Sequence, residues 1–215
     1  MINIYVLLAS GRLRPVADAV QTSVQATCDL VEQALTLSDV DIVIRDDRFR
    51  FIPEWGIGGF APDAHTIQIS LDATRVDDPM LQARLPATVA HELHHTARWL
   101  GPGYGLRLFE AIVTEGLADH FACELLDQPP PPWTQALTSE QIAATKAAAE
   151  PELDTPTHDH GAWFFGTQPD RIPRWAGYTL GWQIVQRYLD QEPTRDAAQL
   201  AIEPSPTFRE SLSTI

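Results

Sequence analysis

The first seventy residues alternate between short apolar runs and one longer amphipathic segment. Apolar residues dominate 2–8 and 42–44, and they alternate with polar ones over 66–71. These patterns predict three β-strands, because successive side chains of a strand point to opposite faces of a sheet. Between the first two, Pro15 opens a stretch to about Leu37 with apolar residues at helical spacing, which predicts a helix.

Two segments of this N-terminal half give weaker signals. Residues 49–52 have the composition of another short strand, and the glycine-rich run 56–59 predicts a tight turn. This run lacks the Lys-Ser/Thr ending of a phosphate-binding loop and does not open a helix. If the strand at 66–71 forms a sheet edge beside a cleft, an extended peptide can add to it as a further strand.

The remainder of the chain is predicted to be helical. Helices are expected over 86–99, 106–126, 139–149 and 174–189, with a last short one from Ser205. Pro86 is expected to open the first of these, and Thr138 with Gln141 fits a capping box before the third. Gly177 and Gly181 lie four residues apart, so another helix can approach closely there.

The order of these elements predicts an α+β fold. We expect a small mixed or antiparallel sheet that includes the N-terminal strand and is flanked by helices. A chain of 215 residues suits one core, so a single domain over 1–215 is predicted. The Pro-, Asp- and His-bearing stretch 150–173 is expected to be an irregular loop that can serve as a lid.

Composition narrows the partners and the location. The formal net charge of −14 repels phosphate backbones, so nucleic acid is not an expected partner. Cys28 and Cys123 are predicted to be free thiols in a reducing compartment, which favours a cytoplasmic protein. The start lacks a basic leader, and no segment is long and apolar enough to cross a membrane. Oligomeric state leaves no signal in the sequence.

The strongest chemical signal is the run His91-Glu92-Leu93-His94-His95, which matches H-E-x-x-H within a predicted helix. Residues four apart lie on nearly the same side of a helix, so His91 and His95 can bind one Zn²⁺. Glu92 can face a metal-activated water and act as its general base. Apolar flanking residues predict a buried helix, which disfavours the alternative of a surface helix rich in His and Glu.

A catalytic zinc site of this type needs a third protein ligand. Metzincins place a His ten residues after the first, but Gly101 occupies that position. The gluzincin solution is a glutamate on the next helix, where Glu110 and Glu115 are the candidates. We favour Glu115, because Asp119 one turn later can accept the N–H of a zinc-bound histidine. Gly116 is expected to let this helix approach the histidine-bearing one closely.

Several stretches carry a family resemblance: His91-Glu92-Leu93-His94-His95-Thr96-Ala97-Arg98, Glu115-Gly116-Leu117-Ala118-Asp119-His120-Phe121, Gly58-Gly59-Phe60 and Trp175-Ala176-Gly177-Tyr178-Thr179-Leu180-Gly181. Over about residues 40–190 the chain resembles an uncharacterised bacterial family of predicted zinc-dependent proteases of gluzincin type. The resemblance implies a gluzincin-like zincin core of a sheet plus zinc helices. It also implies the ligands His91, His95 and Glu115, with Glu92 as the catalytic base.

Peptide hydrolysis also needs a donor for the developing oxyanion. In related gluzincins a Tyr or His from a downstream helix supplies it. Tyr178 is the first choice here, because it lies near the start of the helix that follows the irregular loop. His160, His158 and Tyr104 are the alternatives.

These features predict a zinc-dependent metallopeptidase that acts on a peptide or protein substrate, with Zn²⁺ as its cofactor. The alternative is a non-catalytic binding module that zinc merely stabilises. Glu92 disfavours it, because a structural site has no use for a general base. Structural zinc sites also usually close with four protein ligands, and only three candidates are found.

Overall fold

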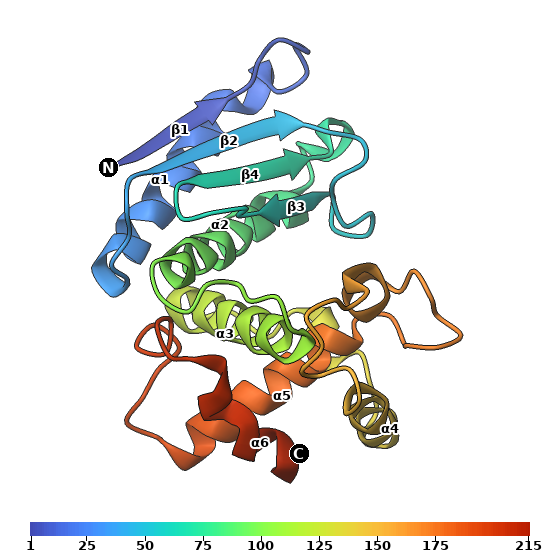
Figure 1. The fold of residues 1–215 in the computed structure, drawn as a ribbon. Coiled ribbons are helices and arrows are strands. Elements are labelled where there is room, and N and C mark those ends of the chain that lie inside the picture. The colour runs from blue at the N-terminus through green and yellow to red at the C-terminus, as the bar shows by residue number, and fades with distance from the viewer. The chain divides into compact units, whose positions relative to one another are not determined.

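The computed structural model describes all residues 1–215 and contains two compact units, Met1–Leu100 and Gly101–Ile215. The first unit holds the sheet and two long helices, and the second is helical (Figure 1). Each unit is described by itself below. The single domain expected over 1–215 stays a prediction.

The sheet of the first unit has four strands, in the spatial order β1-β2-β4-β3. The strands are β1 (Ile2–Val6), β2 (Val40–Asp46), β3 (Ile57–Phe60) and β4 (Thr66–Leu71). β1 and β4 each pair with β2 in parallel, whereas β3 pairs with β4 in the antiparallel sense. The prediction of a small sheet with helices is therefore confirmed, and the sheet is mixed.

One face of this sheet carries the core of the first unit. Helices α1 (Ala17–Ala34) and α2 (Pro79–Trp99) pack against each other and against the strands (Figure 1). The central inward-facing side chains of β2 and β4 are aliphatic and fully buried: Ile42, Ile44, Ile67 and Ile69. Burial of each contributes about 1.5–3 kcal/mol relative to an exposed position. Tyr5 and Phe60, on the edge strands, stay exposed.

Three expectations about the sheet are wrong. The strand at 66–71 is internal, because β4 lies between β2 and β3, and the edge strand is β3. Of the glycine-rich run, only Gly56 lies in a turn, and residues 57–59 belong to this edge strand. Residues 49–52 form only an isolated bridge from Ile52 to Ile57. Tertiary contacts override the low strand propensity of glycine here. A Cβ at Gly58 would lie 2.6 Å from the carbonyl oxygen of Arg50, so only glycine fits.

The metal-motif helix begins earlier than expected. α2 starts at Pro79, and Pro86 lies inside it. The Asp78 side chain accepts a hydrogen bond from the Met80 N–H at 2.9 Å, which caps the helix and explains the earlier start. Pro86 therefore removes one hydrogen bond from the helix interior.

The second unit is built from α3 (Leu108–Leu126), α4 (Ser139–Ala149), α5 (Ala176–Gln191) and α6 (Arg209–Thr214). The capping box of Thr138 and Gln141 is confirmed. The stretch 150–173 is mostly irregular, as expected, but contains a π-helical turn, Gly161–Phe165. Short 3₁₀ turns in the whole chain are Arg14–Val16, Ala73–Arg75, Pro132–Gln135 and Ser205–Phe208.

α3 and α5 cross with their backbones in close contact. A Cβ on Gly181 would lie 2.2 Å from the carbonyl oxygen of Ile112, and one on Gly116 would lie 2.3 Å from the carbonyl oxygen of Gly181. The close approach expected at Gly181 is confirmed. Gly116 allows α3 to approach α5 here, whereas the sequence predicts an approach of α3 to the histidine-bearing helix.

The cysteines and the helix hydropathies concern two simpler expectations. Cys28 and Cys123 are both free thiols, as predicted, and burial raises the pKa of each to about 12. None of the helices combines the length and the hydropathy that a membrane span requires.

Candidate metal centre

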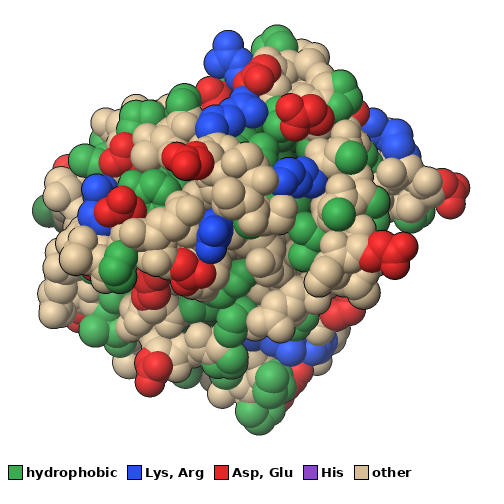
Figure 2. All heavy atoms as spheres, turned by 90° about the horizontal axis from the view of Figure 1, so that it is seen from below, with side chains coloured by type: hydrophobic (Ala, Val, Ile, Leu, Met, Phe, Trp, Pro, Cys, Tyr) green, Lys and Arg blue, Asp and Glu red, His purple; other side chains and the backbone are tan.

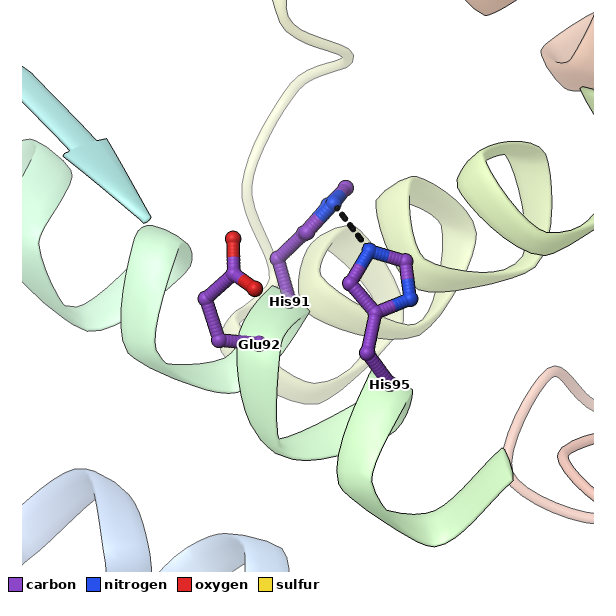
Figure 3. A group of neighbouring side chains, drawn as sticks. All are labelled: His91, Glu92 and His95. Atoms are coloured by element: carbon purple, nitrogen blue, oxygen red, sulfur yellow. Dashed lines mark hydrogen bonds between the residues drawn. The ribbon is translucent and has the colours of Figure 1, made fainter. Parts of the chain in front are cut away.

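His91 and His95 lie one turn apart on α2 and direct their imidazole rings toward each other (Figure 3). Their Nε2 atoms are 3.0 Å apart, and the ring planes are at 89°. Two nitrogens bound to one tetrahedral zinc, each at about 2.0–2.1 Å, lie about 3.3 Å from each other. The pair therefore fits a single zinc ion after an adjustment of a few tenths of an ångström.

Glu92 completes a group of three potential ligands. One ligand atom from each of His91, Glu92 and His95 lies within 4.8 Å of the others. Figure 3 shows the Glu92 carboxylate beside His91. Glu92 is only 6% exposed and His95 only 4%. His94 is fully buried and is not a member of this group. Imidazole nitrogens and a carboxylate are ligands that zinc accepts, so the chemistry of this set fits the metal.

The edge strand β3 holds Glu92 against the sheet. A Cβ added to Gly59 would lie 2.3 Å from Oε1 of Glu92 and 2.5 Å from its Cγ. The carboxylate therefore occupies the space that any other side chain at 59 would fill. Sequence reasoning missed this role. A glycine inside a strand marks close approach of another group, but the composition of the run indicates a turn rather than a strand.

The second unit contains the two glutamates considered as third ligand, in different environments. Glu115 is 5% exposed, and the Tyr104 hydroxyl donates a hydrogen bond to its Oε1 at 2.5 Å. Oε2 of Glu110 accepts the N–H groups of Leu106 and Arg107 at 2.8 and 2.9 Å. Burial alone would raise the pKa of Glu110, but these two backbone donors together with the Arg107 guanidinium outweigh it and lower the pKa. Glu110 thus caps the start of α3.

Asp119, one turn after Glu115, is 2% exposed. Its Oδ2 accepts the indole N–H of Trp133 at 2.8 Å. The backbone oxygen of Trp133 in turn accepts the Thr179 hydroxyl at 2.7 Å, which ties this tryptophan to α5. No sequence pattern identified Trp133, because it follows a proline run and has no spacing relation to α3.

The candidate oxyanion donors Tyr178, His160 and Tyr104 belong to one cluster of aromatic side chains in the second unit. Tyr178 contacts the Phe164 ring edge-on at 5.0 Å between centroids, and His160 stacks on that ring at 4.5 Å. Tyr104 lies 6.2 Å from His160. Ring contacts therefore link these candidates to one another, and Tyr104 is the one with a hydrogen bond to Glu115. The roles predicted for Glu115, Asp119 and Tyr178 stay predictions.

Comparison with known proteins identifies the family to which this chain belongs. Residues 20–209 match the model of the family described as "Predicted Zn-dependent protease (DUF2268)", so the chain belongs to this family. The group of His91, Glu92 and His95 lies within the matched region, and its side chains are of types that can bind zinc.

Two curated relatives come from Bacillus subtilis (strain 168). "Uncharacterized protein YjfC" is 26% identical over 121 residues, which cover 50% of this chain and 40% of that protein. "Uncharacterized protein YjaZ" is 29% identical over 134 residues, which cover 59% of this chain and 50% of that protein. The chain thus spans half the length of these relatives or less. No solved structure matches the chain.

Proposed function

We propose that this protein is a zinc-dependent metallopeptidase of gluzincin type, with a zincin core. The observation that carries the proposal is the group His91, Glu92 and His95 on one buried helix. Membership of a family described as predicted zinc-dependent proteases supports it.

In this proposal His91 and His95 hold the zinc, and Glu115 is the third protein ligand. Three observations support Glu115 over Glu110: its burial, the hydrogen bond from Tyr104, and the engagement of Glu110 in capping α3. Zinc supplies a Lewis acid that lowers the pKa of water and polarises a carbonyl group.

Glu92 acts as the general base and then as the general acid. Its carboxylate accepts a proton from the attacking water and delivers that proton to the nitrogen of the leaving amine. The contact with Gly59 restricts where the carboxylate can lie. Its low exposure limits competition from bulk water for this proton.

Tyr178 and Asp119 take supporting roles. The Tyr178 hydroxyl donates to the developing oxyanion, a role for which Tyr104 is less suited because its hydroxyl already donates to Glu115. Asp119 accepts the N–H of a zinc-binding histidine.

The sheet edge supports a peptide or protein as substrate. β3 is the edge strand, and Gly59 within it contacts Glu92. Ile52 pairs with the start of β3 at Ile57, so the part at Gly59 and Phe60 is left for an extended peptide. A peptide that pairs with this part as an added strand would pass beside the general base.

The decisive test is Glu92→Gln, with Glu32→Gln as a control that makes the same charge change on the exposed surface of α1. Zinc is measured by elemental mass spectrometry, and turnover with a peptide library and an unfolded protein. We expect about one zinc ion per chain in all three proteins. Glu92→Gln should lower turnover by about 100-fold or more, while Glu32→Gln leaves it unchanged.

Two results would contradict the proposal. Unchanged turnover in Glu92→Gln would remove the general base, and the mechanism with it. Zinc bound by the wild-type protein without any hydrolysis would favour the non-catalytic, zinc-stabilised binding module instead.

A further inference from the structure

A pocket of about 400 Å³ opens in the second unit, and the metal-centre proposal does not use it. It lies between the C-terminal half of α3 and the helix α5. The side chains that matter for its chemistry are His120 and Glu124 from α3, Trp182 and Asp190 from α5, and Arg195 beyond it. The pocket therefore combines an aromatic wall with several charged groups.

The hydrogen bonding of His120 fixes which of its nitrogens can bind a ligand. Its Nε2 lies 3.1 Å from the carbonyl oxygen of Trp182, and a carbonyl only accepts, so Nε2 carries the proton. The ring also stacks on the Trp182 ring at 3.7 Å between centroids. Nδ1 is then a hydrogen-bond acceptor, on a side chain that is only 4% exposed. No protein donor lies within hydrogen-bond distance of it.

The second acceptor is the carboxylate of Glu124. Its Oε2 accepts the Ala197 N–H at 2.9 Å, whereas Oε1 lies 4.0 Å from Nδ1 of His120. Two acceptors at this separation repel each other weakly and leave a gap that a donor can fill. An ammonium nitrogen at a normal distance of about 2.9 Å from each fits between them. Two ligands of a tetrahedral zinc would lie about 3.3 Å apart, so the spacing favours ammonium over zinc.

The surrounding charges favour a cation as well. Burial lowers the pKa of His120 to about 4, so the ring is neutral near pH 7 and adds no positive charge. Asp190 supplies a second carboxylate, whose Oδ1 accepts the Gln186 amide at 2.9 Å. Arg195 is the one cation among the lining residues, and it is paired with Glu203 at 3.3 Å.

We propose that this pocket binds a primary ammonium group. Nδ1 of His120 and Oε1 of Glu124 each accept one of its N–H bonds, and the Asp190 carboxylate adds electrostatic attraction. The Trp182 ring gives the attached alkyl chain an apolar surface. A free small amine and the lysine side chain of a peptide share this chemistry.

Isothermal titration calorimetry on the intact, zinc-loaded chain of residues 1–215 tests the proposal. The ligands are 1,4-diaminobutane, lysine amide and a short lysine-containing peptide, with the Nε-acetylated forms of the last two as controls. We expect saturable binding of at least one amine and a loss of about tenfold or more on acetylation. If a free amine binds more tightly than the peptide, the ammonium group comes from a small amine. If the peptide binds more tightly, it comes from a lysine side chain.

Variants locate the binding site. Glu124→Gln keeps the shape and an oxygen for the Ala197 N–H, and it should weaken amine binding by about tenfold or more. Asp190→Asn should weaken it less, and Glu32→Gln should leave it unchanged. Circular dichroism of each variant verifies the fold. In the wild-type protein, the ¹⁵N resonance of His120 Nδ1 should shift on amine addition.

Any one of several results would overturn the proposal. These are the absence of saturable binding by every amine, equal binding in Glu124→Gln and wild type, or a His120 Nδ1 resonance that does not respond. A second zinc ion that binds the wild type and is lost in Glu124→Gln would assign the pocket to a metal instead. Peptidase activity plays no part in these readouts, so they are independent of the function proposed above.

Discussion

The protein contains two histidine–carboxylate groups, one in each unit, and their spacing gives them different chemistry. In the first unit, the Nε2 atoms of His91 and His95 are 3.0 Å apart, close to the separation of two ligands on one zinc ion. In the second, Nδ1 of His120 and Oε1 of Glu124 are 4.0 Å apart, which suits a donor that bridges two acceptors. The same residue types can thus favour a metal or an ammonium group. The distance between the two facing ligand atoms differs by about one ångström between the two groups.

The largest effect expected from this comparison is on catalysis. Glu92→Gln should reduce peptide turnover by about 100-fold to 10,000-fold, because it removes the general base. Glu124→Gln makes the same change in the other group and should leave turnover unaltered. Initial rates of both variants with one peptide substrate measure the difference. Similar losses in both would show that the two groups are not separate in function.

The pH dependence of the free energy of unfolding should come mainly from His120 in the second group. Burial lowers the pKa of His120 to about 4, from an ordinary value of 6.5. Between these values the unfolded chain binds a proton that the folded protein does not. The free energy of unfolding should therefore fall as the pH drops from about 6.5 to about 4, by up to about 3 kcal/mol. Burial raises the pKa of Glu124, and this acts in the opposite direction at the acid end.

Urea unfolding at a series of pH values measures this loss. His120→Gln removes the titrating ring and keeps a donor for the Trp182 carbonyl, so its stability should vary less with pH over this range. Parallel curves for the variant and the wild-type protein would show that His120 does not cause the loss.

Zinc should stabilise the protein through the site that contains His91 and His95, and not through the His120 and Glu124 group. At free zinc of about 100 times the dissociation constant, binding to the folded protein adds about 2.7 kcal/mol to the free energy of unfolding. Wild type and His120→Gln should both show this gain, and His95→Ala should lose it. Thermal melts with zinc and with a chelator give the measurement. Stabilisation of His95→Ala by zinc would place the main metal site elsewhere.

The smallest expected effect concerns the strand that holds Glu92. Gly59→Ala introduces a Cβ at 2.3 Å from Oε1 of Glu92, so the carboxylate must move. Turnover should fall by about tenfold, or about 1.4 kcal/mol in activation free energy, with zinc content unchanged. Gly101→Ala is the control, because a Cβ there meets Ile202 at an ordinary 3.5 Å. Full activity of Gly59→Ala would show that the contact does not position the base.

Local patterns predicted most of the helices and the first histidine group. The spacing of His91 and His95 is a property of any α-helix, so it could be predicted before the fold was known. The capping box at Thr138 was equally local, and it is present as predicted. The predicted start of α2 is wrong, because Pro86 gives a stronger local signal than the Asp78 cap that begins the helix.

Long-range pairing could not be predicted in the same way. The glycine-rich run has no strand pattern, and only its pairing with β4 makes it the edge of the sheet. The contact of Tyr104 with Glu115 and that of Trp133 with Asp119 join residues more than ten positions apart. Such contacts depend on how loops fold back on helices, and no periodicity records that.

The sequence by itself determined the chemical identity of the candidate metal ligands, because helical geometry places residues four apart on one side. Only the tertiary structure decided which strand lies beside Glu92 and which glycine leaves room for it. It also decided the protonation of His120, because a carbonyl from a different helix accepts the proton on Nε2. Covalent spacing fixes what lies within one turn of a helix, whereas packing between distant segments fixes which atoms face a ligand.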